Sequence, residues 1–150
     1  MIIGIGADHN AYGMKEALTA YIKELGHEVV DFGSDDAHTE VDYPEIAFNV
    51  AEAINEKKIE RGILVCGTGI GMAIAACKIP GIRAALCHDT FSAARAQLSN
   101  NAQIISMGER IIGMEVAKQV VKVYLESFFA GGNSARKVQQ IIDKEQSLLG

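Results

Sequence analysis

The sequence contains few of the residues that mark several large classes of protein. Its 150 residues include only three cysteines, Cys66, Cys77 and Cys87, and no two of them have the Cys-x-x-Cys spacing. An odd set without this spacing argues against a disulfide framework or a zinc site and is typical of the reducing cytoplasm. No apolar run approaches the length of a membrane span, and the N-terminus lacks a basic stretch followed by an apolar signal core. We therefore expect a cytoplasmic protein that makes no membrane contact.

An excess of positive charge is also absent. The formal net charge is −5, so nucleic acid is not an expected partner. The composition, 49% hydrophobic and 22% charged, is ordinary for a globular protein. The length suffices for one hydrophobic core and is short for two, and the chain has no repeat, linker or low-complexity segment. These features predict a single domain over residues 1–150.

Apolar runs that suit strands alternate with segments of helical periodicity. We expect strands at 2–6, 28–32, 63–66, 82–87 and 103–107, and helices at 14–25, 44–55, 70–78, 91–98, from 113 to about 130, and at 135–148. This alternation predicts a parallel five-stranded sheet with helices on both faces, a three-layer α/β/α Rossmann-like fold. We expect the flavodoxin-like strand order 2-1-3-4-5, which would place a ligand beyond the carboxyl ends of strands one and three.

The third strand leads into the glycine-rich turn that carries most of the candidate chemistry. An apolar run ends at Cys66, and Gly67, Gly69 and Gly71 then alternate with other residues before a helix. Free N–H groups at such a turn and the helix dipole attract an oxyanion or a phosphate. The spacing differs from the dinucleotide fingerprint Gly-x-Gly-x-x-Gly, and Met72 stands where a Walker A loop has lysine. Cys66 is a candidate base or nucleophile, although a cysteine at a buried strand end is more often a small hydrophobic residue.

Other polar residues fall near the same crevice. Asp8 and His9 follow the first strand and would meet the glycine turn there, although Asp8 could instead only cap a helix. His88 follows the fourth strand, and whether it reaches the crevice stays open. The acidic stretch from Asp35 to Asp42 lacks the regular spacing of a metal loop and suits a solvated loop better. We expect no metal and no cofactor.

Several ordered motifs resemble one family over essentially the whole chain. They are Gly6-Ala-Asp-His9, Asp42-Tyr-Pro44, Cys66-Gly-Thr-Gly-Ile-Gly71, Gly81-Ile-Arg-Ala-Ala85 and Gly108-Glu-Arg110. Together they are similar to the type B ribose-5-phosphate isomerases, a family that includes the galactose-6-phosphate isomerase subunits. The resemblance implies a metal-free aldose–ketose isomerase that works through a cis-enediolate. It also implies a homodimer with shared active sites, and a tetramer stays open.

The resemblance also implies roles for individual residues. Cys66 would move a proton between C1 and C2 of the sugar, and Thr68 would help to move a proton between the two oxygens. The enediolate would be held by the N–H groups of Gly67, Gly69, Ile70 and Gly71. Asp8 and Tyr43 would bind sugar hydroxyls, and His9 and Arg110 would bind phosphate. Asn100 and the segment after Gly132 would serve the partner's site.

The chain departs from the family pattern at two places. Members that act on ribose usually have a ring-opening histidine where this chain has Ser99. They also have a Gly-Gly-Arg-His-x-x-Arg segment whose arginines hold phosphate, where this chain has Asn133 and Lys137, with Arg136 beside the latter. Lysine is a point charge without the planar fork of arginine. Whether Asn133, Arg136 and Lys137 contact phosphate is therefore open.

A tetrose 4-phosphate cannot close a furanose ring, so it needs no ring-opening acid. The stretches 88–92 and 99–104 also resemble the branch described as D-erythrulose-4-phosphate isomerases. We therefore expect an isomerase of a small phosphorylated sugar, with ribose 5-phosphate as the family default and a tetrose 4-phosphate as the preferred substrate. The alternative is a non-catalytic sugar-phosphate-binding protein, which would need neither Cys66 nor Thr68.

Overall fold

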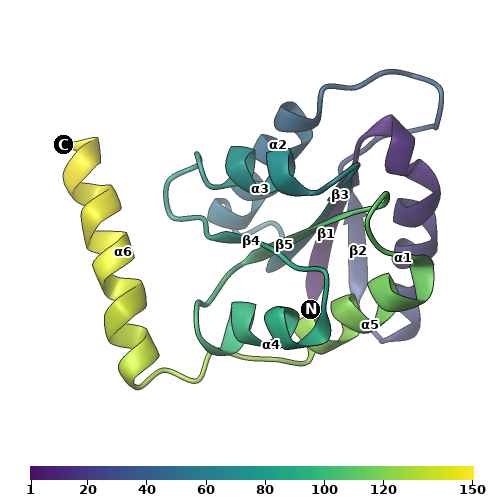
Figure 1. The fold of residues 1–150 in the computed structure, drawn as a ribbon. Coiled ribbons are helices and arrows are strands. Elements are labelled where there is room, and N and C mark those ends of the chain that lie inside the picture. The colour runs from purple at the N-terminus through teal and green to yellow at the C-terminus, as the bar shows by residue number, and fades with distance from the viewer.

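The computed structural model describes residues 1–150, and strands alternate with helices along the chain (Figure 1). The strands are β1 (Ile2–Ala7), β2 (Glu28–Asp31), β3 (Arg61–Cys66), β4 (Ala84–Leu86) and β5 (Ile104–Gly108). The helices are the 3-10 turn η1 (His9–Ala11), α1 (Tyr12–Glu24), α2 (Tyr43–Asn55), α3 (Ile70–Ala76), α4 (Thr90–Leu98), α5 (Met114–Leu125) and α6 (Asn133–Leu149). All the predicted elements are present, although β4 is shorter than the predicted strand at 82–87 and α5 ends at Leu125, before the predicted end near 130. None of the helices combines the length and the apolar character that a membrane span requires.

The five strands form one parallel sheet, as predicted, but the predicted strand order is wrong. The observed order is β2-β1-β3-β5-β4, so the last two strands have exchanged places. All five residues of β5 are buried, whereas β4 is short and its Leu86 is exposed. A strand buried on both faces suits the interior of a sheet, and a short, partly exposed strand suits an edge. Strands that are consecutive in sequence are neighbours only as a tendency.

Helices cover both faces of this sheet, which confirms the three-layer arrangement (Figure 1). On one face, α1, α4 and α5 enclose a core of 20 buried residues that includes Ile5, Val65 and Met107. On the other face, α2 and α3 pack over 13 buried residues that include Leu64, Cys66 and Ile104. Successive side chains of β3 therefore enter different cores, and Cys66 belongs to the α2–α3 side.

Helix α6 stands apart from these layers (Figure 1). Val138 is its one buried residue, and Ile141, Leu148 and Leu149 are exposed. The Gly81 N–H donates a hydrogen bond to the Glu145 Oε1 atom over 2.6 Å and tethers the helix near its C-terminal end. The strongly amphipathic helix therefore leaves most of its apolar side uncovered by its own chain.

Candidate active site

Cys66 is the last residue of β3, and its side chain is only 7% exposed. The chain turns back over the thiol, and the Gly69 N–H donates a hydrogen bond to the Cys66 Sγ atom over 3.1 Å. This turn requires glycine at position 69, where φ is +81°. A Cβ there would also lie 2.7 Å from the carbonyl carbon of Met107. The glycine turn therefore holds one N–H group directly on the sulfur.

Other N–H groups of the same turn have no partner within the chain. Those of Gly67, Thr68 and Gly71 donate no hydrogen bond, whereas the Ile70 N–H donates to the Thr68 Oγ1 atom over 3.3 Å. Of the four amides predicted to hold the enediolate, two are thus engaged within the turn, at Gly69 and Ile70. The other two, at Gly67 and Gly71, are available to an oxyanion.

A cavity of about 290 Å³ lies over the turn. It is lined by Asp8, Tyr43, Cys66, Gly67, Thr68 and Gly71, all of them predicted site residues from three separate parts of the sequence. The backbone N–H of Asp8 donates to the Val65 carbonyl over 3.2 Å, which places the end of β1 beside the end of β3. The prediction that the turn after the first strand meets the glycine turn in one crevice is confirmed for Asp8.

Asp8 and Tyr43 both line this cavity. The Asp8 Oδ1 atom accepts from the Ala11 N–H over 3.1 Å, so Asp8 caps η1 and also lines the cavity. Its second carboxylate oxygen and the Tyr43 hydroxyl form no hydrogen bond within the chain. The ring of Tyr43 lies so close to the Cα of Gly71 that no side chain fits between them. Gly71 therefore lets the ring reach the cavity.

The corrected strand order brings Arg110 to the same place. Because β5 pairs with β3, the Glu109 N–H donates to the Cys66 carbonyl over 2.8 Å, and the Arg110 N–H donates to the Gly67 carbonyl over 3.1 Å. The Arg110 side chain is 71% exposed and is 3.7 Å from the Glu109 carboxylate. It is an adjustable positive charge at the rim of the site. With the predicted order, β4 would have separated this residue from Cys66.

Two supporting residues could not be assigned from the sequence. The Nε2 atom of His88 accepts a hydrogen bond from the Gly108 N–H over 2.9 Å, so His88 supports the end of β5 and does not line the cavity. The hydroxyl of the buried Ser106, in β5, donates to the Gly69 carbonyl over 2.8 Å and so holds the glycine turn against the sheet. A serine inside an apolar strand is a usable signal for such a role, but its partner depends on strand pairing.

His9 lies beside the cavity without lining it. Its Nδ1 atom is 3.4 Å from the Val41 N–H, which donates to it. In the neutral ring, this bond places the proton on Nε2, and Nε2–H can then donate to an anion. The predicted role of His9 in phosphate binding stays a prediction.

The remaining predicted site residues lie elsewhere. Helix α4 starts after the carboxyl end of β4 and returns to the opposite edge of the sheet, where Ser99 and Asn100 follow it. The Asn100 carbonyl there accepts from the Arg83 Nε–H over 3.2 Å, just before β4 begins. Asn133, Arg136 and Lys137 lie in the first turns of the separate helix α6. None of these residues lines the cavity of its own chain.

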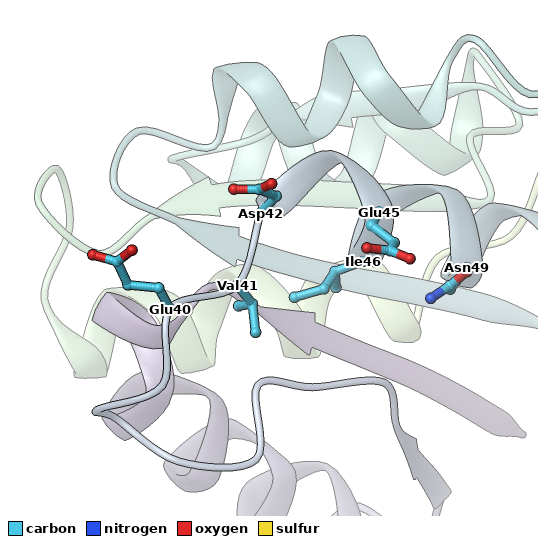
Figure 2. A pocket seen from close by; sticks show the side chains of 6 residues that line it. All are labelled: Glu40, Val41, Asp42, Glu45, Ile46 and Asn49. Carbon is cyan, nitrogen blue, oxygen red and sulfur yellow. The ribbon is translucent and has the colours of Figure 1, made fainter.

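The largest cavity of the molecule, of about 500 Å³, is not this site (Figure 2). It is lined by Glu40, Val41, Asp42, Glu45, Ile46 and Asn49. The three carboxylates make it unfavourable for a phosphate, and they spread along the cavity without converging (Figure 2). In the neighbouring loop, the Asp36 carboxylate accepts from the Thr39 and His38 N–H groups, and these hydrogen bonds lower the pKa of Asp36. No three His, Cys, Asp or Glu side chains are grouped as a metal site requires.

Comparisons with known proteins show the family to which the chain belongs. The family model described as Ribose/Galactose Isomerase matches residues 3–141. The chain belongs to the ribose/galactose isomerase family. A D-erythrulose-4-phosphate isomerase of Pectobacterium atrosepticum is 50% identical over 139 residues, which cover 93% of this chain and 91% of the relative. A ribose-5-P isomerase B of Listeria innocua is 46% identical over 146 residues, covering 97% and 98% of the two chains.

The solved structures include close matches in this family. A ribose-5-phosphate isomerase B of Clostridium thermocellum superposes with a TM-score of 0.95 at 41% identity and covers 99% of both chains. The fold described above is therefore shared with a solved structure of this isomerase family. The present chain is a sugar-phosphate isomerase of that family, and the predicted enzyme class is confirmed.

Proposed function

We propose that this isomerase interconverts the aldose and ketose forms of a small phosphorylated sugar through a cis-enediolate, with Cys66 as the base. The observation that carries the proposal is the cavity in which the Cys66 sulfur lies beside unpaired N–H groups of Gly67 and Gly71. Isomerisation needs a base that removes a proton from one carbon and donors that stabilise the negative oxygen formed next to it. The base and the donors belong to the same glycine turn.

The proton transfers balance without any further reagent. The Cys66 thiolate takes the proton from C1 of the ketose, and the electron pair moves onto the carbonyl oxygen at C2. The enediolate oxygen accepts hydrogen bonds from the Gly67 and Gly71 N–H groups. Thr68 then helps to transfer a proton from O1 to O2, and the thiol returns its proton to C2, which yields the aldose. The free oxygen of Asp8 and the hydroxyl of Tyr43 hold sugar hydroxyls.

The phosphate is bound at the rim by residues of two chains in this proposal. His9 and Arg110 lie beside the cavity of the same chain, whereas Asn100, Asn133, Arg136 and Lys137 do not line it. A homodimer would bring these residues to the partner's cavity. In support of a dimer, Ile74, Leu86, Phe91 and Ile141 expose apolar side chains on α3, β4, α4 and α6. The three free cysteines suit a cytoplasmic location.

The preferred substrate in this proposal is a tetrose 4-phosphate, D-erythrulose 4-phosphate, converted to D-erythrose 4-phosphate. Ser99 cannot act as the acid that opens a furanose ring, and this substrate has no furanose ring. The Pectobacterium relative, which is 50% identical to this chain, carries the name of the same activity. The Listeria relative, 46% identical, carries the name of the pentose activity. Identity alone therefore does not separate the two substrates.

The test compares rates of isomerisation of D-erythrulose 4-phosphate and ribose 5-phosphate by the purified protein at equal concentrations. We expect a clear preference for the tetrose; a clear preference for ribose 5-phosphate would overturn the substrate assignment and leave the enediolate chemistry intact. The Cys66→Ala protein should lose nearly all turnover of either substrate while keeping the melting temperature of the wild type. If neither substrate is turned over but both raise the melting temperature, the chain is a non-catalytic binder.

A further inference from the structure

Arg61 is a buried arginine that the proposed mechanism does not use. It is the first residue of β3, at the edge of the sheet opposite Cys66, and it is only 6% exposed. No carboxylate forms an ion pair with it. Instead its Nη1 donates to the Tyr124 carbonyl and its Nη2 to the Ser127 carbonyl, each over 2.8 Å. The planar fork of one guanidinium thus holds two backbone carbonyls three residues apart.

These carbonyls lie where α5 ends, and aromatic rings complete the contact. A cation at a helix C-terminus can hydrogen-bond the last carbonyls and interacts favourably with the helix dipole. The guanidinium also lies over two rings, 5.1 Å from the centroid of Tyr124 and 4.8 Å from that of Phe128. Phe128 is 59% exposed, so little else holds its ring. Arg61 therefore fixes both the end of α5 and the residues that follow.

The segment held in this way leads directly to α6. Beyond Phe128, the Ala130 N–H donates to the Leu98 carbonyl over 3.3 Å, and Gly131 and Gly132 then turn the chain with positive φ. Helix α6 begins at the next residue and has one buried side chain, and the hydrogen bond from Gly81 to Glu145 tethers it near its other end. The segment that Arg61 holds therefore fixes the position from which α6 starts, and Glu145 fixes its far end.

We propose that Arg61 is a positioning residue for the active site of the partner subunit. It acts by orienting α6, which carries Asn133, Arg136 and Lys137 to the partner's phosphate. This inference rests on the shared sites of the proposed function. Arg61 and Cys66 lie at opposite ends of β3. We therefore expect a substitution of Arg61 to affect the active site of the other subunit, and to change substrate binding more than the chemical step.

The first test uses Arg61→Met, which keeps an unbranched apolar stem and removes the donors, and Arg61→Lys, which keeps the charge and loses the fork. We expect Arg61→Met to raise KM for the sugar phosphate about tenfold while kcat changes less than about twofold, because the base and the oxyanion donors are untouched. Arg61→Lys should raise KM almost as much as Arg61→Met does. A wild-type KM in a folded, dimeric Arg61→Met protein would overturn the proposal.

The decisive test is a purified heterodimer of one Arg61→Met chain and one Cys66→Ala chain, isolated with two different tags. If Arg61 acts across the interface, one site combines an intact Cys66 with an intact α6, and the other has no base. This heterodimer should show the wild-type KM and about half the wild-type kcat per dimer. If KM stays as high as in the Arg61→Met homodimer, Arg61 acts on its own site and the proposal fails.

A matched heterodimer separates this inference from the shared site itself. It pairs Cys66→Ala with a chain carrying Arg136→Ala and Lys137→Ala. If this heterodimer has the wild-type KM while the Arg61→Met heterodimer has a raised KM, only the role of Arg61 is rejected. If KM is raised in both heterodimers, the shared site itself is rejected. Should Arg61→Met not fold, Phe128→Ala serves instead, since this exposed ring can be removed without opening the core. It should give a smaller rise in KM with the same rescue across the interface, and an unchanged KM would count against the proposal.

Discussion

Replacing Gly71 with alanine should displace Tyr43 and reduce activity without unfolding the protein. A Cβ at position 71 would lie 2.5 Å from both Cζ and the hydroxyl oxygen of Tyr43, and nearer still to Cε1. Nonbonded carbon atoms are most favourable at about 3.5–4.0 Å, so the ring must move by about 1 Å. Tyr43 is 38% exposed, which lets it move toward solvent. A misplacement of about 1 Å can cost roughly a hundredfold in rate.

We therefore expect kcat/KM of Gly71→Ala to fall about a hundredfold in an aldose–ketose interconversion assay. The melting temperature should not fall, because alanine favours a helix by about 1 kcal/mol over glycine. Gly13→Ala is the matched control, since a Cβ there meets nothing within 4 Å. It should keep wild-type activity.

A double-mutant cycle isolates the cause. Tyr43→Ala removes the ring that the new methyl group would strike, so adding Gly71→Ala to it should cost little further activity. If Gly71→Ala has the kcat/KM of the wild type, the position of Tyr43 is not required for turnover. If the double mutant loses activity additively, the methyl group acts by some route other than Tyr43.

Three further predictions concern other parts of the molecule. The Lys15 ammonium is fully buried and contacts both oxygens of the half-exposed Asp31 carboxylate, at 2.7 and 2.9 Å. Asp31→Ala leaves that buried charge without its partner and should lower the free energy of unfolding by about 3 kcal/mol. Lys15→Met removes the charge itself and should lower the free energy of unfolding clearly less, as measured by urea denaturation. Burial raises the pKa of the Cys87 thiol from 9.0 to about 11, so from pH 9 to 11 the thiol ionises in the unfolded chain but not in the folded one. Stability should therefore fall over that range, and less steeply in Cys87→Ala; equal slopes would refute this account. Ser99→His should raise the rate with ribose 5-phosphate relative to D-erythrulose 4-phosphate, and an unchanged ratio of the two rates would separate ring opening from this position.

The outcome at β4 and β5 explains why the candidate site was only partly predictable. Apolar runs located both strands, because periodicity is a local property of the chain. Their order in the sheet depends on which strand pairs with β3, and local sequence patterns give no information about that pairing. This error affected the candidate site, because the contact of Arg110 with the Gly67 carbonyl and the hydrogen bond from Ser106 to the Gly69 carbonyl both follow from β5 lying beside β3.

The sequence by itself determined the strand that ends at Cys66, the glycine turn after it, the parallel α/β architecture and the family. These depend on residues that are neighbours along the chain, where the absence of a side chain or a run of apolar side chains restricts the backbone directly. Only the tertiary structure decided that the Gly69 amide is engaged by the thiol while that of Gly67 is free, and that Ser99 and α6 lie away from their own cavity. Such facts depend on contacts between distant segments, whose geometry exists only once the sheet has assembled.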